Sequence, residues 1–440
     1  MFQYKGETAV TLPRRPVAGM LLWLLISAGL SAETYTLGRA LQAAREADAV
    51  LEQASRSLAQ ARIEERSSWN LFLPELSAGV TVGRDVFTEG RRDPSQVALS
   101  AGASLGIGSA VDRRIESRTL TREAAVLELE RRRVALEEEV KRRFYTVLLT
   151  ERRISIAERN LTLAEQQLAR VRARYESGRA SELELLEARA AAINRRPVVL
   201  SRREELERER AALRELLGLK PDVPLTLDGE ISVPEVEMEA EAIRHALRAG
   251  APELHAARLS LRRAENAQTV SFRDNKLPRL SASYSYSPSF SPAFEAASYR
   301  DAEPWQSGRV SVRLTVPLDP LVPRSQADNR VRAARTDVER ARLQFEETVA
   351  GLEHLAAERA KQLDVARKRL LLREEAVEVA RQRFEATRGA YDSGGVDLLD
   401  VEDARRALEE AELSLLEERY SILLTLVELD AAAGGGILSE

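Results

Sequence analysis

Apolar side chains recur every three or four residues along most of this chain. The spacing starts at Leu37 and continues through Ala40, Ala44, Ala47, Leu51, Ala54, Leu58 and Ala61. It is typical of helices that pack side by side in a coiled coil. It predicts a first helix over about Leu37–Phe72, which Pro74 ends. Two longer helices are predicted over about Asp112–Arg174 and Ser325–Ala390, each roughly 90–100 Å long at about 1.5 Å per residue.

Four short segments follow a different pattern, in which apolar residues alternate with small or polar ones. They are Leu76–Val82, Val97–Gly108, Leu280–Ser287 and Val310–Val316. Alternation with a period of two predicts β-strands that have one apolar and one polar face. The strands come in two pairs, and each pair lies between long helices. A mainly helical fold with a small sheet is therefore expected.

The chain repeats its own order of elements. Tyr175-Glu-Ser-Gly178 recurs as Tyr391-Asp-Ser-Gly394, 391 − 175 = 216 residues later, and Leu73-Pro-Glu-Leu76 recurs as Leu277-Pro-Arg-Leu280. Each half reads helix, strand, strand, helix, turn, helix, and Pro197 is expected to kink the last helix of the first half. The predicted divisions are a first repeat over 33–220, a linker over 221–235, a second repeat over 236–433 and a tail over 434–440.

Composition narrows the class of protein. Charged residues make up 31% of the chain and aromatic residues 5%, which favours long helices, and the net charge of −4 gives no reason to expect nucleic acid. No cysteine is present, and no metal-binding, phosphate-binding or nucleophile motif was found, so we expect neither a cofactor nor an enzyme. Residues 1–32 have two arginines, then an apolar stretch and small residues, which predicts a secretory signal peptide.

The strands are near the length that a tilted strand needs to cross a bilayer. A soluble, half-buried sheet would show the same alternation, but the signal peptide favours a membrane. Aromatic residues around the longer connection would fit a membrane interface: Tyr284, Tyr286, Phe290, Phe294, Tyr299 and Trp305. Four strands cannot close a barrel, and an open edge in lipid leaves backbone groups unpaired. Three copies would supply twelve strands, whereas a soluble periplasmic coiled-coil scaffold or adaptor remains the alternative.

The two Tyr-x-x-Gly turns, the Leu-Pro-x-Leu strand starts and the duplication together resemble the TolC-type outer-membrane efflux proteins over about Leu37–Leu429. The resemblance implies a homotrimer with a twelve-stranded barrel shared by the chains and embedded in outer-membrane lipid. It also implies a helical tunnel in the periplasm. A periplasmic adaptor (membrane fusion protein) and an inner-membrane pump would open the tunnel for efflux or type I secretion, and no cofactor is implied.

The same resemblance implies roles for residues at the two turns. Asp400 and Asp403 match the acids that form a gate and selectivity ring, although acids also favour the first turns of any helix. Tyr391 and Glu184 match a gate latch, whose arginine is replaced here by Val396. Nearby arginines could substitute for it: Arg172, Arg174, Arg383 and Arg388. Adaptor contact is expected at the turns, at Tyr175, Gly178, Arg179, Tyr391 and Gly394.

Overall fold

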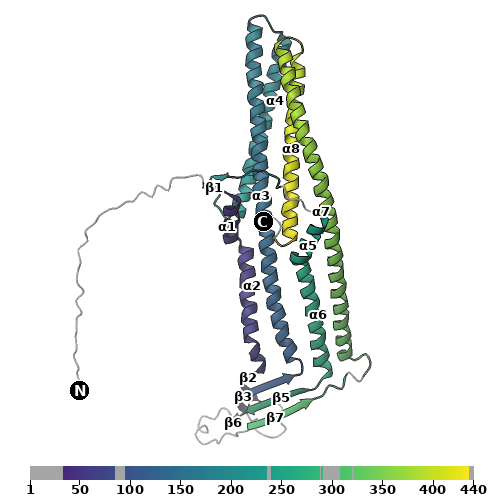
Figure 1. The fold of residues 1–440 in the computed structure, drawn as a ribbon. Helices are drawn as coiled ribbons and strands as arrows, with labels where there is room; N and C mark the ends of the chain where they lie inside the picture. Colours follow the sequence, from purple (N-terminus) through teal and green to yellow (C-terminus); the bar gives the residue numbers. More distant parts are fainter. Residues whose placement is uncertain are drawn as a thin grey trace, which may run out of the picture.

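A computed structural model of the chain describes residues 33–84, 95–234, 239–287, 289–290, 308–319 and 322–435. The predicted signal peptide lies outside this range, as do Phe294, Tyr299, Trp305 and the end of the predicted tail. The molecule is elongated, with a sheet at one end and two helical turns at the other (Figure 1). The turns at the far end are called the tips below: the first joins α3 to α4, and the second joins α7 to α8.

The helices confirm the predicted coiled-coil pattern. Two helices run nearly the length of the molecule, α3 (Val111–Glu176) and α7 (Gln326–Asp392). Each packs against a returning helix, α4 (Glu182–Leu216) and α8 (Leu398–Ala432) respectively. Nearer the sheet, α2 (Ala49–Arg66) lies against α3, and α6 (Pro252–Lys276) lies against α7. Pro197 lies inside α4, which is a single helix from its first residue to its last.

The predicted first helix is broken, which is a correction to the sequence-based boundary. It forms α1 (Leu37–Ala47), α2 and a 3₁₀ turn η1 (Ser67–Phe72), with the break at Asp48. Asp48 has an extended backbone, and its carboxylate accepts the amide of Leu51 at 2.7 Å, so it caps α2. Aspartate is among the residues that best cap the N-terminus of a helix. In the sequence, however, Asp48 cannot be distinguished from the other polar residues between the apolar positions of the repeat. The second half breaks similarly between α5 (Ala240–Gly250) and α6.

All four predicted strands are confirmed. They are β2 (Glu75–Arg84), β3 (Ser95–Gly108), β5 (Arg279–Tyr286) and β7 (Gly308–Thr315), paired antiparallel in the order β2-β3-β5-β7. A two-residue strand, β6 (Ser289–Phe290), also pairs with β3. Two further strands were not foreseen: β1 (Glu33–Tyr35) and β4 (Leu225–Leu227) pair in parallel, and β4 lies within the segment predicted as a linker.

The register keeps apolar residues together across the four strands. Leu105 lies opposite Ala282, which lies opposite Val312, while Ser283 on the other face lies opposite Ser311. Directly opposed residues share a face, so one side of the sheet is apolar and the other is built from serine, glycine, threonine and a few charged residues. The apolar side is uncovered: Val310 and Val312 are 76% and 70% exposed.

The buried core lies at mid-height, where α1, α5 and the small β1–β4 pair meet the long helices (Figure 1). Its first part surrounds Phe144 and Val140 of α3, and its second part surrounds Leu247 of α5 and Ile422 and Leu426 of α8. None of the described helices is long and apolar enough to cross a membrane.

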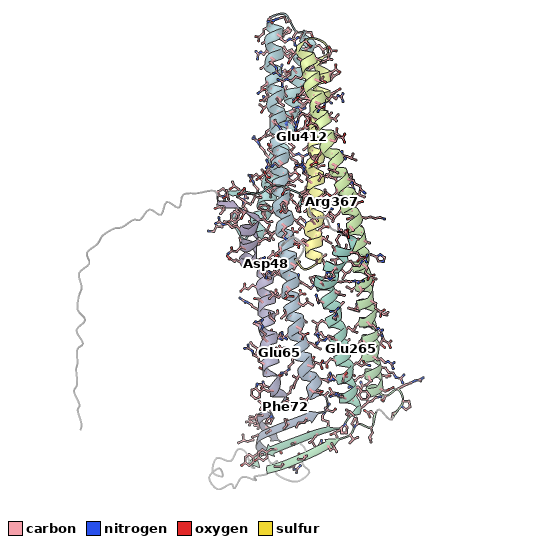
Figure 2. All side chains as sticks on the ribbon, viewed as in Figure 1. Asp48, Glu65, Phe72, Glu265, Arg367 and Glu412 are labelled. Carbon is pink, nitrogen blue, oxygen red and sulfur yellow. The ribbon has the colours of Figure 1, made fainter. Side chains whose placement is uncertain are left out.

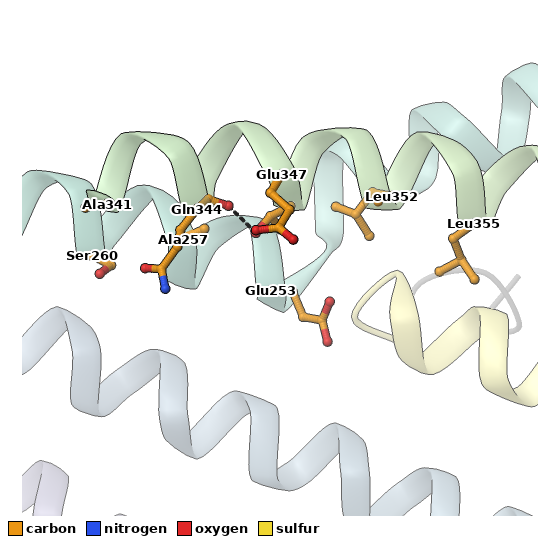
Figure 3. Close-up of a pocket in the computed structure, with 10 residues that line it drawn as sticks. Glu253, Ala257, Ser260, Ala341, Gln344, Glu347, Leu352 and Leu355 are labelled. Carbon is orange, nitrogen blue, oxygen red and sulfur yellow. Dashed lines mark hydrogen bonds between the residues drawn. The ribbon is translucent and has the colours of Figure 1, made fainter. Parts of the chain in front are cut away.

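Ion pairs connect the polar surfaces of neighbouring helices. Arg122 of α3 contacts Glu65 of α2 at 2.9 Å, and Arg159 of α3 contacts Glu412 of α8 at 3.0 Å. Figure 2 labels the two acids, Glu65 near the sheet and Glu412 nearer the tips. Between α6 and α7 lies an open groove of about 590 Å³, where small residues such as Ala257, Ser260 and Ala341 leave space beside Glu253 (Figure 3). It lies on the sheet side of the mid-height core, away from the tips.

Candidate functional site

The two tips are built by the same set of hydrogen bonds, 216 residues apart. At the first, the amide of Arg179 donates to the carbonyl of Arg174 at 2.7 Å; at the second, Gly395 donates to Ala390 at 2.8 Å. Gly178 and Gly394 have φ of 74° and 80°, the left-handed conformation that ends a helix and that glycine adopts without strain. The repeated sequence Tyr-x-Ser-Gly therefore encodes the same helix end twice.

The helices that leave the tips also start alike. Ser181 caps α4 and Asp397 caps α8, and each forms a reciprocal capping box with the acid three residues later, Glu184 or Asp400. The amide of Ser181 donates to Glu184 at 2.8 Å, and that of Asp397 donates to Asp400 at 3.3 Å. Glu184 and Asp400 are thus equivalent positions of the repeat, and both serve the local helix start.

The two tip tyrosines differ in their surroundings. Tyr175 is 41% exposed, whereas Tyr391 is 7% exposed and packs against Val171 of α3, Ala188 of α4 and Leu398 of α8. Tyr391 therefore joins the two helical hairpins at the tip. Val396, at the position where the resemblance would place an arginine, packs against the same cluster.

An arginine of the first hairpin binds Tyr391. Arg174 donates from Nη1 to the hydroxyl of Tyr391 at 3.0 Å, and its guanidinium lies 5.3 Å from the centre of the tyrosine ring. Burial raises the pKa of the Tyr391 hydroxyl, and the nearby Arg174 charge opposes this effect. Among the described residues, the hydrogen bonds of Glu184 go to Ser181 and none joins it to Tyr391. Of the four arginines proposed as substitutes, Arg174 is the one whose contact with Tyr391 is seen among the described residues.

Asp400 and Asp403 lie one helical turn apart on α8, and both are exposed. A spacing of three residues places them on the same side of the helix. Asp403 forms an ion pair with Arg406 at 2.8 Å, while Asp400 has no ion pair within the described residues. Within one chain, the negative charge of Asp400 is therefore the less compensated of the two.

A buried ionic cluster centred on Arg405 lies beside these acids on α8, and no sequence pattern predicts it. Arg405 of α8 is 4% exposed, forms an ion pair with Glu402 and donates to the backbone carbonyl of Asn160 in α3 at 3.1 Å. Arg195 of α4 lies 3.8 Å from the same Glu402 and 2.8 Å from Glu409. Burial lowers the pKa of Arg405. This Arg405 cluster (Arg405, Glu402, Arg195, Glu409 and Asn160) connects three helices.

A groove of about 510 Å³ runs between α4 and α8 beside this cluster. Its walls include Glu187 and Arg195 from α4, and Leu398, Glu402 and Arg406 from α8. At the end of the molecule, Arg179 is exposed and donates to the hydroxyl of Ser177 at 3.1 Å, and nothing lies within 4 Å of where a Cβ of Gly178 or Gly394 would be. The tip turns are thus open surfaces.

The fold and tips define an elongated, mostly helical protein with an amphipathic four-stranded sheet at one end. The chain matches the outer membrane efflux protein family over residues 40–219 and 243–435, one match for each half. This protein belongs to that family. No curated protein matches the chain in sequence.

Solved structures share the fold over almost the whole chain. The outer membrane protein VceC of Vibrio cholerae aligns with a TM-score of 0.74 at 17% identity, covering 91% of this chain and 96% of that chain. The Campylobacter jejuni CmeC outer membrane channel gives 0.75 at 14% identity, covering 98% and 95%. The open state of the Neisseria gonorrhoeae MtrE channel gives 0.73 at 18% identity, covering 91% and 89%.

The family match confirms the sequence-based predictions of family, outer-membrane location and function. The protein is an exit duct of the outer membrane for efflux. Neither the family match nor the structural likenesses favour the soluble periplasmic scaffold considered as the alternative.

Proposed function

We propose that three copies of this chain share one twelve-stranded barrel in the outer membrane, and that their helices form a passive duct through the periplasm. The observation that carries this proposal is the uncovered, amphipathic sheet. Within the described residues, β2 pairs only with β3 and β7 pairs only with β5, so each sheet has two open edges. In lipid, open edges leave backbone groups without hydrogen-bond partners, and closure removes them. Three sheets of four strands give a barrel of twelve.

Exposed apolar residues on the long helices support the same assembly. They lie on α4 and α7 far from the sheet, and they include Leu186, Ile193, Leu200, Leu371, Leu372 and Val379. Single exposed apolar residues are common, but several along each of two long helices favour contact with another protein surface. Adjacent copies in a ring would cover them.

Engineered cysteines test the trimer directly, since the chain has none of its own. Leu76→Cys on β2 is combined in turn with Val310→Cys, Val312→Cys and Leu314→Cys on β7. A disulfide needs Cβ atoms about 4 Å apart, so one combination is expected to give covalently linked trimers on oxidation. Leu105→Cys with Val312→Cys is the control, because β5 separates these strands within a chain. A protein that stays monomeric in detergent and links in no combination contradicts the proposal.

The tips are the proposed gate. Asp400 and Asp403 of three chains would place six carboxylates around the narrow end, attracting cations. Tyr391, held by Arg174, is the proposed latch between the hairpins, with Glu184 contributing charge beside it. A periplasmic adaptor and an inner-membrane pump would contact the exposed turns at Tyr175, Gly178, Arg179 and Gly394, and the pump would supply energy and choose the substrate. The duct itself carries out no chemical reaction.

Ion selectivity in planar bilayers tests the gate assignment. Asp400→Asn keeps an oxygen that can cap α8 but removes the charge, so the helix start is preserved. We expect Asp400→Asn to reduce cation preference more than Asp403→Asn, because Arg406 already offsets Asp403. The double variant should reduce it most. Unchanged reversal potentials in asymmetric salt for the double variant would refute the gate assignment, and a purified protein that forms no pore at all would refute the duct.

A further inference from the structure

The polar face of the sheet carries an excess of positive charge that the duct function does not require. Three arginines lie on it: Arg279 at the start of β5, and Arg309 and Arg313 on β7. The pairing register places Ser285 opposite Arg309, Ser281 opposite Arg313 and Thr315 opposite Arg279, so all three arginines share the serine side. Within the four paired strands, the one acid on this face is Glu75 at the start of β2.

Contacts among the described residues do not remove the charge excess. Within the described residues, Arg309 and Arg313 are exposed and form no ion pair. Arg279 lies 3.9 Å from Asp274, but Asp274 is already bound by Arg114 at 2.7 Å. Three arginines and one glutamate leave 3 − 1 = 2 positive charges on the face of each chain. This sum does not depend on how strands of neighbouring chains pair, so a trimer would carry six.

The residues around the arginines on this face of the sheet have small side chains. The strand next to β7 presents Ser281, Ser283 and Ser285, and the hydroxyls of Ser283 and Ser311 lie 2.8 Å apart. Arg279 and Arg313 occupy diagonal positions on adjacent strands, where Cα atoms are about 7–8 Å apart. Two like charges at that distance repel each other, and an anion between them relieves the repulsion. The planar guanidinium group binds carboxylate, sulfonate and phosphate groups through paired hydrogen bonds.

We propose that Arg279, Arg309 and Arg313 form a positively charged band in the wall of the duct at its membrane end, which attracts anionic groups of solutes as they leave. This inference rests on the proposed function, since it takes the polar face of the sheet as the face toward the lumen. The duct then has opposite charge at its two ends, with carboxylates at the tips and guanidinium groups at the sheet.

The two ends act independently because of the distance between them. The helix α3 has 66 residues and spans the way from sheet to tip, which corresponds to about 100 Å. Charges are screened over about 10 Å at 0.1 M salt. A substitution at one end should therefore leave the ion preference of the other end unchanged, and each end can be tested with its own probe.

The test is block of single-channel current by citrate, a trivalent anion, added on the sheet side of a phosphatidylcholine bilayer at low salt. The double variant Arg309→Gln/Arg313→Gln removes both charges of β7, and Arg309→Lys/Arg313→Lys is the matched control that keeps them. Citrate block should weaken about tenfold in the glutamine variant, a change of roughly 1.4 kcal/mol. It should persist in the lysine variant and in Asp400→Asn/Asp403→Asn.

Three results would overturn the inference. Citrate block that is equally strong in the glutamine variant shows that the arginines do not face the solute path. Block lost in Asp400→Asn/Asp403→Asn instead places the anion effect at the tips. A difference in citrate block between the native protein and the glutamine variant that disappears when phosphatidylglycerol replaces phosphatidylcholine shows that the arginines bind lipid headgroups. Each of these results leaves a working pore and the proposed function intact. A protein that forms no pore would refute both the proposed function and the arginine band.

Discussion

Replacement of the buried Arg405 by methionine should loosen the start of α8 from its neighbours. The side chain is 4% exposed, pairs with Glu402 and donates to the backbone of Asn160 in α3. Methionine fills much of the same space without charge, so the change removes the ionic contacts rather than opening a large cavity. The internal repeat supplies the control: Arg189, 405 − 189 = 216 residues earlier, has the equivalent position on α4 but is exposed.

The size of the effect follows from the contacts that are lost. Removing one partner of a buried ion pair typically costs about 3–5 kcal/mol, because the other charge stays buried without compensation. Here Glu402 keeps Arg195 at 3.8 Å, which moderates the loss. We therefore expect about 2 kcal/mol for Arg405→Met, close to that of a hydrogen bond to a charged group. Arg189→Met should change stability by less than about 0.5 kcal/mol.

Hydrogen exchange of backbone amides measures this locally. A loss of about 2 kcal/mol corresponds to roughly 30-fold faster exchange, and it should concentrate in α8 over residues 398–411 and in the facing part of α3. The double variant Glu402→Gln/Arg405→Met should recover part of the protection, since it leaves no unpaired charge. Faster exchange spread evenly over the chain, or no greater in Arg405→Met than in Arg189→Met, would refute the reasoning.

Two further predictions concern contacts between helices. Tyr391→Phe removes the hydroxyl that Arg174 binds but keeps the ring, so it should cost about 1 kcal/mol at the tip. Burial holds the pKa of Tyr391 above its ordinary value of 10.0, so its stabilising contribution is complete below pH 10 and is lost as the pH rises through the folded-state pKa. Hydrogen exchange at the tip, measured as the pH rises above 10, should show this loss of stability in the native protein and not in Tyr391→Phe. Identical pH profiles for the two proteins would contradict the prediction. Lys141→Met breaks a 2.7 Å ion pair with Asp430, whose side chain is 3% exposed, and should cost about 3 kcal/mol in thermal unfolding. Lys141→Met/Asp430→Leu should recover most of this, and a double variant as unstable as the single one would show that packing rather than charge is responsible.

The sequence was sufficient for the elements that obey a simple period. The long helices follow from apolar residues spaced three or four apart, and the four strands follow from alternation with a period of two. The paired tips follow from the internal repeat, in which each pattern occurs twice. It was insufficient where a residue departs from its neighbours. Asp48 breaks the first helix because one carboxylate caps α2, and the pair β1–β4 joins segments nearly 200 residues apart, which no local pattern records.

The tips show the same limit. The two similar turns could be predicted from Tyr-x-Ser-Gly. The burial of Tyr391 and the exposure of Tyr175 could not, because they depend on how the α3–α4 hairpin packs against the α7–α8 hairpin. Arg405 follows the apolar residue Ala404 on α8, and its equivalent Arg189 follows Ala188 on α4, so the local sequence does not distinguish the buried arginine from the exposed one. The sequence offers four arginines near the tips as possible partners of Tyr391, and the structure shows that Arg174 binds it.

The wall of the molecule changes its members at mid-height. On the tip side it consists of α3, α4, α7 and α8, and on the sheet side of α2, α3, α6 and α7, so α4 and α8 stop about where α2 and α6 begin (Figure 1). Among the described helices, α3 and α7 alone pass through the junction. In the proposed trimer, α4 and α8 can therefore swing sideways and widen the tip end without moving the strands, because neither helix reaches the sheet, and the proposed barrel keeps its circumference.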